Sequence, residues 1–130
     1  MNMRRHRCLA VLERAYRGAL EEQYGHILWI CWSICQMNRQ IAVLLRGHAA
    51  LYARCNCPPQ SLTISGIPVH LPNYEESIRG LLSQGGAVYV VSADLDRLQL
   101  SADQLCSGVQ AVDGAELTRL FADYDAVWYL

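Results

Sequence analysis

Charged side chains and long apolar runs are both scarce in this sequence. Asp, Glu, Lys and Arg make up 18% of the 130 residues, below the share of about 25% that is usual for globular chains. The longest apolar run, Ile27 to Cys35, is interrupted by Ser33 and is much shorter than the roughly 18 residues of a membrane-spanning helix. The net charge is −1, and residues 3–7 form the main basic cluster. We therefore expect no membrane span and no nucleic-acid groove.

Phosphate-binding and secretory patterns are missing as well. The sequence contains neither a GxGxxG nor a GxxxxGK[ST] loop, and no serine, base and carboxylate set can be assembled, so nucleotide-dependent and hydrolase chemistry have no support. We predict no cofactor. The apolar run that starts at Cys8 stops at Glu13 without a cleavage site, unlike a signal peptide. Three of the six cysteines lie in apolar runs, which indicates buried thiols in a reducing cytoplasm.

The stretch from Gly85 to Leu100 organises the rest of the chain. A glycine pair precedes five small or β-favouring apolar residues, 87–91, and Ser92 then leads into a short helix or turn. An apolar run without polar alternation is typical of a parallel strand between two helical layers. Ligands gather beyond the carboxyl ends of such strands. This places a candidate pocket at Val91, Ser92 and Asp94, together with Gly47 and His48 after the preceding strand.

The remaining elements alternate between strands and helices. We predict strands at 7–13, 41–45, 108–112 and 125–130, and helices at 19–35, 73–84 and 113–122, with short helical turns near 49–54 and 101–104. Residues 55–66 carry the Pro, Ser, Thr and Gly of an irregular loop. The order predicts a single domain over residues 1–130, a three-layer α/β domain with a mostly parallel five-stranded sheet.

Four segments together resemble a known family. The segments AYRGALEEQYGHILWICWSICQ, QIAVLLRGHAALYA, GAVYVVSADLDRLQL and GVQAVDGAELTRLFADYDAVWYL are similar to the DsrE/DsrF-like family, which includes the TusB, TusC and TusD sulfur-relay subunits. The Ser-Ala-Asp-Leu turn and the Ala-Asp-Tyr-Asp-Ala-Val ending are closest to the DsrF/TusC branch. The resemblance implies a flavodoxin-like sheet and a role in persulfide transfer. It also implies homo-oligomers or hetero-oligomers with DsrE-like paralogues, and a sulfur-carrier protein as a further partner.

One departure from the family bears on activity. The resemblance implies a reactive cysteine at the end of the third strand, where this chain has Val90 and Val91. The DsrF/TusC branch also lacks that cysteine, so we expect a non-catalytic or weakly active relay subunit and a packed, dry strand end. A small-ligand-binding module is an alternative.

A second alternative is a sulfurtransferase that uses the loop thiols Cys55 and Cys57. Arg54 is adjacent and would favour a thiolate. The simpler alternative is that Cys55 and Cys57 are two unreactive loop thiols. Together with His48 and His70 the pair has the ligand types of a zinc site, but a CxC pair is tighter than the usual CxxC knuckle and the two histidines follow separate strands. We therefore predict no metal.

Aromatic residues in apolar settings predict subunit contacts. Trp29 and Trp32 lie three positions apart on one face of the predicted helix, and Trp128 and Tyr129 lie in the last strand. Packing within the chain is the alternative for the two helical tryptophans.

Overall fold

The computed structural model describes residues 7–13, 23–36, 40–55, 61–70 and 74–129. Its centre is a parallel sheet in which the strand order is β6-β5-β2-β1-β7 and every pair of neighbours is parallel. The strands are β1 (Arg7–Leu12), β2 (Gln40–Leu45), β5 (Ala87–Val91), β6 (Gln110–Val112) and β7 (Ala126–Tyr129). The predicted five-stranded parallel sheet is confirmed.

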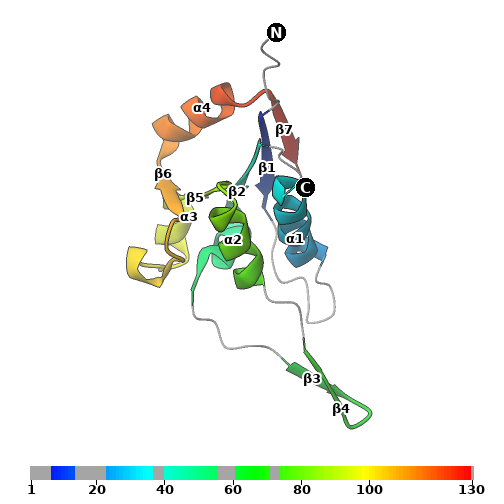
Figure 1. The fold of residues 1–130 in the computed structure, drawn as a ribbon. Helices are drawn as coiled ribbons and strands as arrows, with labels where there is room; N and C mark the ends of the chain where they lie inside the picture. The colour runs from blue at the N-terminus through cyan, green and yellow to red at the C-terminus, as the bar shows by residue number, and fades with distance from the viewer. Residues whose placement is uncertain (1–6, 14–22, 37–39, 56–60, 71–73, 130) are drawn as a thin grey trace.

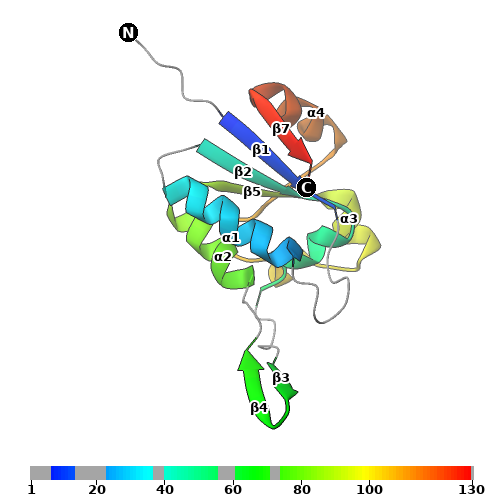
Figure 2. The same cartoon turned by 90° about the vertical axis from the view of Figure 1, so that its right-hand side faces the viewer.

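Helices cover both faces of this sheet. Figure 2 shows α1 (Gln23–Gln36) and α2 (Tyr74–Ser83) side by side on one face, and α4 (Gly114–Asp123) beyond the other. Shorter helical turns follow two strand ends and precede β6: η1 (Gly47–Ala53), α3 (Ser92–Arg97) and η2 (Ala102–Gln104). Each had been predicted within a few residues. The domain is therefore a three-layer α/β structure.

Strand side chains divide between two cores. Alternate residues of a strand point to opposite faces, so Ala10 and Leu12 pack toward α1 and α2, whereas Leu9 and Val11 pack toward α4. β2 is the middle strand, and its residues from Ile41 to Leu45 are all buried. β5 is less deeply placed than its apolar sequence suggests, because only Val88 and Val90 are buried and its other side chains are half-buried.

The contact between α1 and α2 explains one of the tryptophans. Trp32 packs against the core beneath α2, and a Cβ atom added to Gly80 would lie 2.7 Å from ring atom Cδ2 of Trp32. Trp32 therefore packs within the chain rather than against another subunit. The side chain of Trp29 lies outside the described residues.

A β-hairpin replaces part of the expected loop at 55–66. Strands β3 (Ser61–Ile64) and β4 (Ile67–His70) pair antiparallel and project from the sheet (Figures 1 and 2). The turn uses Ser65 at φ 52° and Gly66 at φ 78°, the left-handed conformations of a two-residue hairpin loop. The prediction of irregular structure was wrong here, because the short apolar runs flanking Ser-Gly are a hairpin pattern. Residues 56–60 lie outside the described part.

The helices of the described segments are too short or too polar to cross a bilayer.

Candidate functional site

The carboxyl ends of β2 and β5 meet through the predicted pocket residues Gly47 and Asp94. The backbone N–H of Gly47 donates to Asp94 Oδ2 at 2.8 Å, and Arg97 donates to Asp94 Oδ1 at 3.1 Å. Nearby, Arg46 N–H donates to the Leu12 carbonyl at 3.0 Å. The Asp94 carboxylate is half-buried and joins two strand ends.

The other strand-end residues are engaged or turned outward. Ser92 Oγ donates to the Val112 carbonyl at 3.0 Å, which joins the end of β5 to the end of β6. His48 is exposed on η1. Val90 is fully buried, whereas Val91 is half-buried against the core on the α4 side. These contacts stabilise the strand ends, and the predicted pocket residues described there include no thiol.

Cys55 lies in a polar cluster at the start of α2. Its Sγ atom is 3.1 Å from Glu75 Oε1 and 3.1 Å from Arg79 Nη2, and Arg79 also pairs with Glu75 at 2.7 Å. Glu75 is a buried carboxylate in the first turn of α2, and the four-residue spacing puts Arg79 on the same face. The Cys55 sulfur therefore touches both a proton acceptor and a cation.

A second thiol completes this cluster. Cys106 is 2% exposed, and its Sγ lies within 4.8 Å of both the Cys55 sulfur and a Glu75 oxygen. An antiparallel bridge between Arg54 and Leu105 holds the two connections together, and each cysteine directly follows a bridge residue. Burial first, and then the neighbouring Cys55 thiol, raises the pKa of Cys106 to about 12. The cluster thus pairs a half-buried thiol with a buried, protonated one.

The arrangement allows proton transfer without a change of net charge. The Cys55 thiol donates to the Glu75 carboxylate, and moving that proton leaves a thiolate beside Arg79. A guanidinium beside the sulfur offsets the negative charge that this proton transfer creates, and the thiolate is the nucleophilic form of cysteine. The hydrogen bond to Cys55 is in turn the largest cause that raises the pKa of Arg79, so the guanidinium keeps its charge. Nucleophilic thiol chemistry is what the geometry suits.

The same donor set has the ligand types of a soft-metal site. Two cysteines and a glutamate within 4.8 Å of one another match the chemistry that zinc prefers. The Arg79 guanidinium, however, already contacts both Cys55 and Glu75, so a metal ion would have to displace a cation from its carboxylate. Cys57 lies outside the described residues, as does the His70 side chain, so the zinc set weighed from sequence falls partly outside the described part of the chain.

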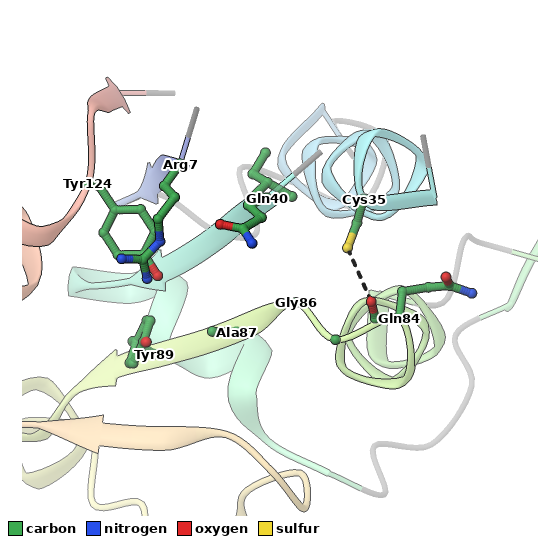
Figure 3. Close-up of a pocket in the computed structure, with 10 residues that line it drawn as sticks. Arg7, Cys35, Gln40, Gln84, Gly86, Ala87, Tyr89 and Tyr124 are labelled. Atoms are coloured by element: carbon green, nitrogen blue, oxygen red, sulfur yellow. Dashed lines mark hydrogen bonds between the residues drawn. The ribbon is translucent and has the colours of Figure 1, made fainter. Parts of the chain in front are cut away.

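A cavity of about 410 Å³ lies at the other end of the strands, where they begin (Figure 3). It opens at the first residues of β1, β2 and β5, and its polar lining includes Arg7, Gln40 and Tyr124. The Arg7 guanidinium lies 4.7 Å from the Tyr124 ring centre. Burial, with a smaller part from Tyr89, raises the pKa of Tyr124 to about 12. This cavity is at the amino ends of the strands, whereas the sequence pointed to their carboxyl ends.

Three members of the thiol cluster were missed by the sequence reasoning. Glu75 and Arg79 are visible as an acid and a base four residues apart on a predicted helix, a spacing that indicates an ion pair. Cys106 sits in a short connection with no motif around it. Their meeting with Cys55 depends on how two connections lie against α2, which local sequence does not specify.

Two solved structures share this fold. The chain aligns with the ychN protein from E. coli at 18% identity and a TM-score of 0.76, covering 96% of this chain and 99% of that one. It also aligns with MTH1491, a protein of unknown function from Methanobacterium thermoautotrophicum, at 15% identity and a TM-score of 0.66, covering 93% and 96%. No family model matches the chain, and no curated protein matches it. At these identities the likeness establishes the fold alone.

Proposed function

We propose that this chain is a DsrE/DsrF-like protein that accepts sulfane sulfur as a persulfide on Cys55. The observation that carries the proposal is the contact of the Cys55 sulfur with Glu75 and Arg79, each at 3.1 Å. The family resemblance supplies the substrate class. A thiol acceptor must stay reduced to act, so we place the activity in the cytoplasm.

The transfer requires one proton acceptor and one cation. The Cys55 thiol gives its proton to Glu75, and the thiolate attacks the terminal sulfur of a donor persulfide, R–S–SH. The S–S bond of the donor breaks, the new S–S bond forms on Cys55, and the leaving thiolate R–S⁻ takes the proton from Glu75 to become R–SH. No net oxidation occurs. Arg79 Nη2 lies 3.1 Å from the attacking sulfur and offsets its negative charge.

Mass spectrometry of the loaded protein tests the proposal. Brief exposure to glutathione persulfide is expected to add one sulfur atom, which maps to the peptide containing Cys55. Cys55→Ser should abolish the adduct. Cys35→Ser is the matched control, because Cys35 is also half-buried but its thiol donates to a backbone carbonyl, that of Gln84 at 3.8 Å, and not to a carboxylate. An adduct that survives in Cys55→Ser would contradict the proposal.

Arg79→Gln tests the role of the cation in the same assay. Arg79 is largely exposed, so solvent screens its charge, and loading should slow only by roughly threefold to fivefold. Arg97→Gln is the control, because Arg97 makes a similar ion pair with Asp94 at 3.1 Å. Equal rates in both variants would show that Arg79 does not assist the thiolate.

A second candidate is a relay subunit that is itself inactive and assembles with a DsrE-like paralogue. Val90 and Val91 favour it, since they occupy the strand end that carries the reactive cysteine in the family it resembles. In that case glutathione persulfide would load a co-purified partner and leave Cys55 unmodified.

A further inference from the structure

Cys55 and Cys106 are brought together by the backbone rather than by chance side-chain contact. Cys55 N–H donates to the Gln104 carbonyl at 2.7 Å and Cys106 N–H donates to the Ala53 carbonyl at 2.8 Å, one on each side of the Arg54–Leu105 bridge. Side chains of neighbouring residues in an extended chain point to opposite sides. The side chains of Cys55 and Cys106 therefore share one side of the bridge, and those of Arg54 and Leu105 share the other. Two hydrogen bonds therefore hold the thiols on one side of the same short ladder.

Their exposure differs, and the difference gives each thiol a separate role. Cys55 is half-buried at the cluster, whereas Cys106 is 2% exposed and in contact with the main core. An external donor thus reaches Cys55 first, while Cys106 is placed to meet what Cys55 has acquired. An accessible thiol next to a shielded one is the arrangement in which the second thiol resolves an adduct on the first.

We propose that Cys106 is the resolving thiol of Cys55, attacking the Cys55 sulfur when that sulfur carries a leaving group and forming a Cys55–Cys106 disulfide. For a persulfide, which rests on the function proposed above, Cys106 gives its proton to Glu75 and attacks Cys55 Sγ. The bond to the outer sulfur breaks and hydrosulfide, HS⁻, leaves. The sulfane sulfur is reduced and the two thiols are oxidised.

The same pair reacts after oxidation by a hydroperoxide, independently of sulfur transfer. The peroxide converts the Cys55 thiol to a sulfenic acid and is itself reduced to water or an alcohol. The Cys106 thiol then attacks the sulfenic sulfur, and a second water leaves as the disulfide forms. A thiol reductant restores both cysteines through thiol–disulfide exchange.

The register indicates that the disulfide is a transient one. The residue opposite Cys55 across the bridge is Gln104, so Cys106 is a diagonal neighbour, and diagonal pairs lie farther apart than directly opposite pairs. A disulfide requires the sulfurs to close to about 2.05 Å. The connections must therefore shift to form the bond, and strained disulfides are reduced readily.

Two arms of one experiment separate this inference from the proposed function. In the first, the reduced protein is treated with hydrogen peroxide and digested without reduction; we expect a cross-linked peptide pair containing Cys55 and Cys106. In the second, the protein is loaded with glutathione persulfide, desalted and followed over time. We expect the adduct on Cys55 to decay with release of hydrosulfide, and to last about tenfold longer or more in Cys106→Ser.

Cys106→Ala is examined in parallel because a serine hydroxyl at this buried position can destabilise the fold. Cys31→Ala is the matched control, since Cys31 is equally buried but lies on α1 within the core. The inference is overturned if peroxide gives the cross-link but the persulfide adduct on Cys55 persists in wild type, because Cys106 then does not attack that adduct. The proposed function stands in that case. Cross-linking without any loading supports the resolving pair and overturns the proposed function. Absence of the cross-link, with equal adduct lifetimes in wild type and both Cys106 variants, also overturns the inference.

Discussion

Single buried cysteines should make the stability of this protein measurably dependent on pH above about pH 9. Burial raises the pKa of Cys31 from 9.0 to about 12. The thiol stays protonated in the folded chain while it ionises in the unfolded chain, so its contribution is complete below pH 9 and is lost as the pH rises from 9 to about 12. At about pH 10 the loss from Cys31 amounts to roughly 1.4 kcal/mol.

Urea unfolding under reducing conditions at about pH 8 and pH 10 checks this expectation. The free energy of unfolding should fall between the two values in wild type and fall less in Cys31→Ala, whatever stability the substitution costs at pH 8. Cys106 and Tyr124, whose pKa values are also raised to about 12, contribute in the same direction and are common to both proteins. Identical falls in the two proteins would show that Cys31 ionises equally easily in the folded state.

The sequence predicted one residue of the thiol cluster, Cys55, but none of the side chains that surround it. Cys55 stood out because it lies in a loop after a buried strand and beside Arg54. The guanidinium that contacts its sulfur, however, comes from Arg79, which is 24 positions away in sequence. Burial of Glu75 and Cys106 depends on how α2 and the connection before β6 pack, and neither has a local sequence signature.

At the scale of elements, the packing of α1 on α2 depends on a residue without a side chain. Gly80 sits inside α2, where alanine would ordinarily favour the helix by up to about 1 kcal/mol. Here a Cβ atom would meet the Trp32 ring, so we expect Gly80→Ala to destabilise the protein by about 1–3 kcal/mol. Gly114→Ala is the control, because no atom lies within 4 Å of the added Cβ at the start of α4.

The midpoint of urea unfolding measures both substitutions. Gly80→Ala should lower it clearly, and Gly114→Ala should leave it unchanged or raise it slightly. A neutral Gly80→Ala would mean that Trp32 moves aside at little cost, and that α1 and α2 are less tightly packed than the contact indicates.

Elements with a strong periodic pattern were predictable, and those that depend on turn chemistry were less so. The apolar run at 87–91 matches β5 at both ends. The helix predicted at 113–122 is α4, and its N-cap residue Asp113 accepts a 2.8 Å hydrogen bond from Glu116 N–H. The hairpin at 61–70 was missed because Ser-Gly was grouped with the surrounding loop residues. The five parallel strands were predicted from their apolar runs, whereas the strand order β6-β5-β2-β1-β7 was not predicted.

At the scale of the whole molecule, large apolar side chains lie at the surface in three places within the described part of the chain. Ile30 lies on α1, Ile64 and Ile67 lie beside the hairpin turn, and Trp128 and Tyr129 lie on β7. Among these, β7 combines two aromatic residues with a sheet edge, because β1 is its only partner strand in the described sheet. Exposed edges with large apolar side chains are sites of association.

We therefore expect this chain to self-associate through β7. Trp128 and Tyr129 are 41% and 68% exposed and, as consecutive strand residues, present an aromatic ring on each face of the edge. Sedimentation at tens of micromolar should give a mass above the 14.6 kDa of one chain. Aromatic anchors typically contribute more than about 1 kcal/mol each, so replacing both residues with serine should weaken association by roughly tenfold or more.

The hairpin supplies the control for this last prediction. Ile67 is 65% exposed, about as much as Tyr129, and belongs to β4. Figure 2 shows β4 away from β7, so Ile67→Ser removes an exposed apolar side chain without touching β7. Loss of association in Ile67→Ser but not in the β7 double variant would move the contact to the hairpin. A wild-type chain that sediments as a monomer would instead mean that the exposed aromatics of β7 are tolerated in water, and that the low charged share needs no partner surface to explain it.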